Sequence, residues 1–144
     1  MSKELIGIAV DHGGFALKQP VVEEMRALGY EVLDLGTDDE ESVDYPDMSD
    51  NLIAAFRDGR VNRGVLICGT GVGISIAANR HAGIRAALCY DDETAALARQ
   101  HNDANVMCLG GRKTGVEQAR GMVRIFLGTE FEGGRHARRV GKLG

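Results

Sequence analysis

The sequence contains no tryptophan, only two prolines and only three cysteines in 144 residues. No apolar run approaches the roughly 18 residues that a membrane-spanning helix needs, so a membrane protein is not expected. The amino-terminal residues carry no secretory signal and the cysteine count is odd, which predicts a reducing, cytoplasmic location and free thiols at Cys68, Cys89 and Cys108. The net charge of −4 argues against general affinity for nucleic acid.

The remaining composition is that of a globular protein. Hydrophobic residues make up 44% and charged residues 26% of the chain. The length fits a single domain over residues 1–144, which can bury a sizeable core without a metal or disulfide. Glycine is abundant, with 20 residues. Because proline is scarce, this glycine indicates tight turns and close backbone approaches rather than linkers.

Apolar, strand-like runs alternate with helical patterns along the chain. Strands are predicted at residues 5–10, 31–35, 63–68, 84–89 and 105–109, and helices at residues 15–28, 47–58, 72–79, 92–101 and 116–127. Pro20 weakens the first helix or moves its start to residues 18–19. The alternating run 31–35 predicts an edge strand, and the basic tail 131–144 is expected to be partly helical. Five strand–helix units predict an α/β sandwich around a parallel sheet.

Ligands of such folds bind at the carboxyl ends of the strands. The sharpest feature there is Cys68-Gly69-Thr70-Gly71-Val72-Gly73, where alternate glycines leave backbone amides accessible at a helix start, as in an anion cradle. It is not a Walker A loop, because no Lys-Ser/Thr pair follows. It is not a dinucleotide fingerprint, because Ile74 stands where that motif needs glycine. A tight turn without a ligand is the structural alternative.

Other chemistry-bearing residues accompany this loop. Cys68 faces a helix N-terminus, which favours a thiolate, although free cysteines are usually small buried residues. His12 and His101 could transfer protons. Arg135 and Arg139 would share a helical face and suit phosphate, unless that face is only solvated. The sequence has no H-x-x-x-H or C-x-x-C spacing, so no metal is expected. This set predicts a small phosphorylated substrate and a thiol that attacks a carbonyl or moves a proton beside one.

Five segments then carry a resemblance to a known family. They are AVDHGGFxLK at residues 9–18, DYP at 44–46, ICGTGVGISIAAN at 67–79, RQHNDxNV at 99–106 and EGGRHxxRV at 132–140. With them the sequence resembles the type B ribose-5-phosphate isomerases of the ribose/galactose sugar-phosphate isomerase family. The resemblance implies a three-layer α/β/α sandwich with a five-stranded parallel sheet, similar to a Rossmann fold. It also implies a metal-free and cofactor-free enzyme that forms a homodimer or a dimer of dimers.

The resemblance further implies that ribose 5-phosphate and ribulose 5-phosphate interconvert through an enediolate. Cys68 would be the base, His101 would open the sugar ring, and Thr70 would help to stabilise the oxyanion. In a second branch of the family a glutamate replaces the cysteine as base; its position here is Ile74. The implied substrate-binding residues are Asp11, His12, Tyr45, Gly69, Gly71, Val72, Gly73, Asn102, Arg112, Arg135 and Arg139.

Alternatives stay open at this stage. The substrate could be a six- or four-carbon aldose phosphate, because pocket size cannot be read from the sequence. A non-catalytic phosphosugar-binding module or a thiol redox protein would use the same scaffold differently. No lid that could exclude water from a site is recognisable in the sequence. Together with this absence, the resemblance implies a site shared across a homodimer, with Cys68 from one chain and His101 from the other.

Overall fold

Strands and helices alternate along the chain, as the sequence predicts. The computed structural model describes residues 3–144. Its strands are β1 (Leu5–Val10), β2 (Glu31–Asp34), β3 (Gly64–Cys68), β4 (Ala86–Leu88) and β5 (Val106–Gly110). Its helices are α1 (Phe15–Ala27), α2 (Tyr45–Arg57), α3 (Val72–Asn79), α4 (Asp92–Gln100), α5 (Val116–Gly128) and α6 (Arg135–Gly141).

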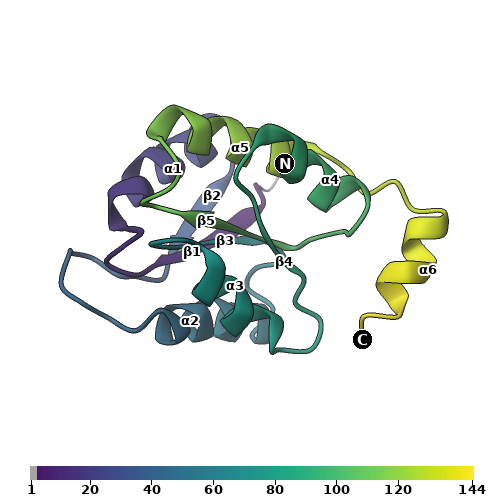
Figure 1. The fold of residues 1–144 in the computed structure, drawn as a ribbon, viewed down its shortest axis with the longest axis horizontal. Helices are drawn as coiled ribbons and strands as arrows, with labels where there is room; N and C mark the ends of the chain where they lie inside the picture. The colour runs from purple at the N-terminus through teal and green to yellow at the C-terminus, as the bar shows by residue number, and fades with distance from the viewer. Residues whose placement is uncertain (1–2) are drawn as a thin grey trace.

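The five strands form one parallel sheet in the order β2-β1-β3-β5-β4. Helices α1, α4 and α5 cover one face, and α2 and α3 cover the other (Figure 1). The predicted α/β/α sandwich with a five-stranded parallel sheet is therefore confirmed. The edge position predicted for residues 31–35 is confirmed as well, because β2 pairs with β1 alone.

The central strands are apolar throughout because both faces of the sheet are covered. Side chains alternate between the two layers: Val65 and Ile67 pack under α1 and α5, whereas Leu66 and Cys68 face α2 and α3. A fully buried aliphatic side chain contributes about 1.5–3 kcal/mol, so this alternation fixes the register of β3 firmly. It also fixes the side of the sheet on which the Cys68 sulfur lies.

Most boundaries differ by one or two residues from the sequence prediction, and two features of α1 and β4 have a physical explanation. Helix α1 begins at Phe15, as predicted, and continues through Pro20, so the alternative start at residues 18–19 is wrong. Pro20 cannot donate to the carbonyl of Ala16, but Ala16 is exposed and water can satisfy that oxygen. Strand β4 is shorter than predicted, because the amide of Arg85 donates to the Asn105 side chain instead of to a strand carbonyl (2.8 Å).

Helix α6 stands outside the sandwich, as Figure 1 shows at the yellow end of the chain. None of its residues is buried. The tail is thus partly helical, as predicted. Within residues 3–144, no helix has the length and apolar character needed to cross a lipid bilayer.

Candidate functional site

Three glycine-rich loops meet where the central strands β1, β3 and β5 end. We call this region the cysteine edge; it comprises residues 11–14, 68–73 and 110–112. Its loops are joined through their backbones: the amide of Gly111 donates to the Cys68 carbonyl (2.8 Å), and the amide of Arg112 donates to the Gly69 carbonyl (3.0 Å). These loops contain several of the many glycines in the sequence.

Side chains larger than hydrogen would not fit between these loops. A Cβ placed on Gly13 would lie 2.9 Å from the Cα of Gly69, and one on Gly110 would lie 2.6 Å from the Thr70 carbonyl oxygen. Both distances are shorter than the contacts that Cβ atoms make with backbone atoms in proteins. The close packing leaves the backbone of the cysteine edge little room to move.

Cys68 ends β3 and is almost fully buried, with 4% of its surface exposed. Its Sγ accepts a hydrogen bond from the amide of Gly71 (3.1 Å), and α3 begins one residue later. Gly71 has a φ of 81°, a left-handed conformation that glycine adopts without strain. An amide donor and a helix N-terminus are the surroundings in which protein thiols act as bases or nucleophiles.

The amides of the loop are partly engaged within the chain itself. That of Gly71 points at the Cys68 sulfur, and that of Val72 donates to the hydroxyl of Thr70 (3.1 Å). The carbonyl of Thr70 in turn accepts from the Tyr90 hydroxyl (2.7 Å), which holds the loop in place. The position of the alternative glutamate base is occupied by Ile74, which is fully buried in the core.

Four further predicted site residues surround this loop. Asp11 is buried and accepts from the amide of Gly14 (3.1 Å). The Nδ1 of His12 accepts from the amide of Val43 (3.2 Å), so the Nε2 of its neutral ring carries the proton and can donate. The Arg112 guanidinium lies beside Gly69, and the Tyr45 ring lies against Gly73.

The remaining predicted residues lie at the opposite edge of the sheet. Helix α4 starts after β4 at the carboxyl edge and runs antiparallel to the strands, so His101 and Asn102 follow it near the start of β5. The register of β3 and β5 shows how far His101 lies from Cys68 along the strands. Cys68 pairs with Gly110, the last residue of β5, whereas His101 lies near its first residue. Four residues of strand, about 13 Å, therefore separate the level of Cys68 from Val106, the first residue of β5.

We call this second region the histidine end; it comprises His101, Asn102, Glu132 and α6. The rings of His101 and His136 stack with centroids 4.2 Å apart, and the Glu132 carboxylate lies 3.9 and 3.7 Å from their Nε2 atoms. Partial burial lowers the pKa of His136, and the charges of His101 and Arg135 lower it further. A cleft of about 280 Å³ opens beside His101, Asn102 and Arg139.

Arg135 and Arg139 lie one helical turn apart on α6, as the sequence predicts. Within residues 3–144, neither guanidinium makes an ion pair with an acidic side chain. Both are therefore available to an anion from outside the chain.

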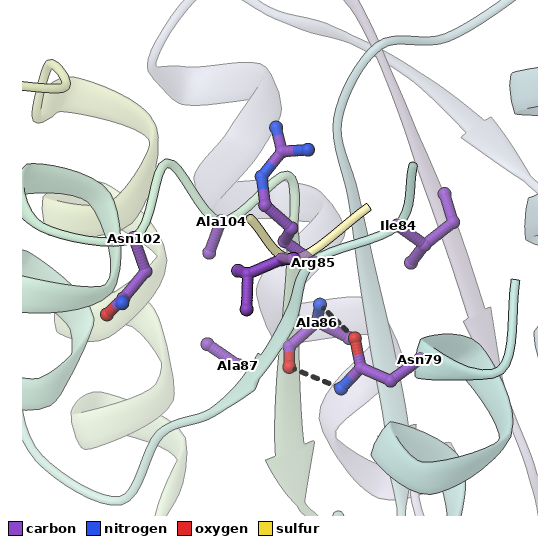
Figure 2. A pocket seen from close by; sticks show the side chains of 8 residues that line it. Asn79, Ile84, Arg85, Ala86, Ala87, Asn102 and Ala104 are labelled. Carbon is purple, nitrogen blue, oxygen red and sulfur yellow. Dashed lines mark hydrogen bonds between the residues drawn. The ribbon is translucent and has the colours of Figure 1, made fainter. Parts of the chain in front are cut away.

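A second cleft of about 440 Å³ lies along the free edge of β4 and is also lined by Leu143. Figure 2 shows that the Asn79 carboxamide faces Ala86 there and makes two hydrogen bonds with its backbone, each 2.8 Å long. The side chain thus satisfies backbone groups of an edge strand that has no neighbour on that side. Apart from Asn102, the residues that line this cleft were not indicated by the sequence.

The other two cysteines have no part in either region. Burial raises the pKa of Cys89 to about 12, with the charge of Asp91 adding to the effect, and burial also raises the pKa of Cys108 well above its usual value. Both remain neutral thiols in the apolar core. All three cysteines are free and buried in this structure.

Comparison with known proteins identifies the family. The model of the ribose/galactose isomerase family matches residues 6–143. The chain belongs to this family. Its relatives are ribose-5-phosphate isomerases. The chain is therefore an aldose–ketose isomerase, which is an intramolecular oxidoreductase.

Individual relatives agree with this membership. Ribose-5-phosphate isomerase B of Escherichia coli (strain K12) is 49% identical over 135 residues, which cover 94% of this chain and 91% of that protein. The structure of ribose-5-phosphate isomerase B from Clostridium thermocellum matches with a TM-score of 0.94 and 51% identity, over 97% of this chain and 95% of that one. The type B enzyme of Trypanosoma brucei has the same TM-score at 43% identity, over 99% and 97% of the two chains.

The histidine end also holds residues that sequence reasoning did not single out. Glu132 and His136 lie beside His101 although they are about thirty residues away in the chain. Their spacing of four residues was not a reliable signal, because Glu132 precedes α6 and the two side chains do not share a helical face. The proximity of His101 to this pair could not be read from the sequence.

Proposed function

We propose that this isomerase interconverts ribose 5-phosphate and ribulose 5-phosphate in the cytoplasm. The observation that carries the proposal is Cys68, held at the end of β3 with the Gly71 amide on its sulfur. Similarity to ribose-5-phosphate isomerase B of Escherichia coli supports the choice of substrate. Three free thiols support a reducing compartment.

The proposed chemistry begins with ring opening. His101 transfers a proton to the ring oxygen while the hydroxyl on C1 gives up its proton to water, so the bond between C1 and the ring oxygen breaks and the aldehyde of the aldose is freed. The Cys68 thiolate then removes the proton on C2, and the electron pair forms a C1–C2 double bond while the carbonyl oxygen becomes an oxyanion. The proton returns to C1. The C2 hydroxyl gives up its proton as the ketone forms, and O1 gains one.

Other residues would hold the substrate during these steps. Thr70 and the amides of residues 69–73 would stabilise the enediolate oxyanion. Asp11 and Asn102 would bind sugar hydroxyls, and Tyr45 would line the pocket. His12, with its Nε2 free to donate, would bind the phosphate together with Arg112, Arg135 and Arg139.

These residues can act together only if two chains combine. Cys68 and His101 lie at opposite edges of one sheet, which supports a homodimer whose cysteine edge meets the partner's histidine end. Tyr45, Val72 and Ile76 beside the cysteine edge are 40–55% exposed in the single chain, an apolar surface that a partner would cover. The partner would also exclude water from the enediolate.

A kinetic panel of aldose phosphates tests the substrate. We expect the highest kcat/KM with ribose 5-phosphate and no loss of activity in EDTA, compared with allose 6-phosphate, galactose 6-phosphate and erythrose 4-phosphate. A six-carbon sugar is the second candidate, because the family description includes galactose. One methylene-sized difference gives only about 10–200-fold discrimination, so a galactose 6-phosphate preference of that size would replace ribose as the substrate.

Erythrose 4-phosphate also isolates the role of His101, because its carbon chain is too short to close a furanose ring with the phosphate in place. His101→Ala should lose most of its activity on ribose 5-phosphate while keeping activity on the four-carbon sugar. Equal losses on both substrates would remove ring opening from the role of His101.

A further inference from the structure

Two histidines and a glutamate converge at the histidine end from three separate segments. His101 follows α4, Glu132 lies in the connection before α6, and His136 lies on α6. One ligand atom from each lies within 4.8 Å of the others. A hydrogen bond from the amide of Glu132 to the Gln100 carbonyl (3.1 Å) anchors the connection beside His101.

This donor set matches the requirements of zinc. Two imidazoles and one carboxylate, with a fourth position left open, form a recurrent set for zinc in proteins. Bond lengths of about 2.0–2.2 Å in a tetrahedron place ligand atoms roughly 3.3 Å apart. The distances of 3.9 and 3.7 Å from Glu132 Oε1 to the two Nε2 atoms therefore need to shorten by only about half an ångström.

The stacked rings must also tilt. Their planes differ by only 12°, so the lone pairs of the two rings lie in nearly parallel planes and cannot converge on one point. Side-chain rotation at His101, whose side chain is 41% exposed, can provide that tilt without disturbing the core. Magnesium and calcium prefer oxygen ligands, so a site with two imidazoles discriminates against both ions.

We propose that His101, Glu132 and His136 form a zinc site and that zinc bound there inhibits the isomerase. The inhibitory part rests on the proposed function, in which His101 transfers a proton to the sugar ring. A ring nitrogen that is coordinated to zinc has no lone pair to accept a proton and cannot deliver one. Zinc also fixes α6, and with it Arg135 and Arg139, in the arrangement that the single chain shows.

The neighbouring charges limit the affinity of this site. Arg135, Arg138 and Arg139 place three positive charges on the helix that carries His136. They oppose a divalent cation, whereas Glu132 favours it. Zinc binding should therefore be reversible by a chelator, as in a regulatory site, rather than a permanent structural feature.

Direct binding to the full-length, metal-free protein is the first measurement. Competition with a chromogenic zinc chelator should give one zinc per chain for the wild type. His136→Asn and Glu132→Gln should weaken binding by roughly 10–100-fold or more, because each removes a ligand. His81→Asn is the matched control, since His81 is a half-exposed histidine beside Asp50, away from the cluster, and its loss should change nothing. Wild-type stoichiometry and affinity in His136→Asn would overturn the site.

Inhibition is measured as the rate of each variant in zinc relative to its own zinc-free rate. Zinc should inhibit the wild type and the His81→Asn variant alike, magnesium should not, and EDTA should restore the rate. His136→Asn should need at least about tenfold more zinc. Equal inhibition of His136→Asn would mean that zinc acts elsewhere, for example on Cys68, and would overturn the proposal. The binding assay needs no substrate, so a chain inactive on every sugar phosphate would refute the proposed function without deciding the zinc site.

Discussion

The cysteine edge and the histidine end differ in how they are built. Backbone hydrogen bonds and glycines without room for a Cβ hold the first, and its central residue Cys68 is buried. The second consists of charged and imidazole side chains on a helix with no buried residue. The backbone of the cysteine edge is therefore fixed within one chain, whereas the side chains of α6 have little packing within the same chain to fix their positions.

The largest effect is expected at the cysteine edge. Cys68→Ala should lower kcat by 10²–10⁴-fold or more, because general-base catalysis contributes about that much. Phosphosugar binding, measured by calorimetry, should persist because the phosphate-binding side chains remain. Cys89→Ala is the matched control: it also removes a buried thiol, but should leave kcat unchanged. Near-normal kcat in Cys68→Ala would remove the sulfur from the mechanism.

The arginines of α6 should matter less, and selectively. Arg135→Ala or Arg139→Ala should lower kcat/KM by roughly 10–100-fold, since each charge-assisted hydrogen bond to phosphate contributes about 1.5–3 kcal/mol. Arg138 is rotated by about 100° from Arg139 around the axis of α6, so Arg138→Ala serves as the control and should change kcat/KM much less. Equal effects at all three positions would indicate general electrostatic attraction instead of a phosphate site.

The pairing of the two regions across chains can be tested with two inactive variants. Cys68→Ala and His101→Ala are unfolded together and refolded as a mixture, so that about half of the dimers are mixed. In each mixed dimer one site carries both substitutions and the other carries neither. Activity on ribose 5-phosphate should return to roughly a quarter of wild type. A silent mixture, with mixed dimers verified by mass, would contradict the shared site.

Stability should distinguish the two regions by a smaller amount. Gly110→Ala inserts a Cβ 2.6 Å from the Thr70 carbonyl oxygen, and should lower the free energy of unfolding by about 1–3 kcal/mol. Gly141→Ala in α6 meets nothing within 4 Å and should raise it by at most about 1 kcal/mol. Urea unfolding of both variants measures the difference. Equal values would mean that the cysteine edge is not as closely packed as its geometry implies.

Much of the fold could be predicted because the local patterns agree with it. The uninterrupted apolar runs predicted buried parallel strands, and the alternation in residues 31–35 predicted an edge strand. The first helix was predicted with its observed start, and only the alternative start that Pro20 suggested was wrong, since the cost of this proline depends on whether Ala16 is exposed to water, which is a tertiary property. The end of β4 was also unpredictable, because the Asn79 and Asn105 side chains take over its backbone hydrogen bonds.

The sequence by itself determined the chemistry available to this protein: a thiol at a glycine-rich helix start, histidines, and two arginines at helical spacing. It also determined the family, through motifs spread over most of the chain. Only the tertiary structure decided which of these groups can meet. The antiparallel course of α4 carries His101 to the edge of the sheet opposite Cys68 and brings it instead to Glu132 and His136. The order of motifs along the chain does not reveal which residues meet. A helix that runs back across the sheet carries the residues after it to the other end of the strands.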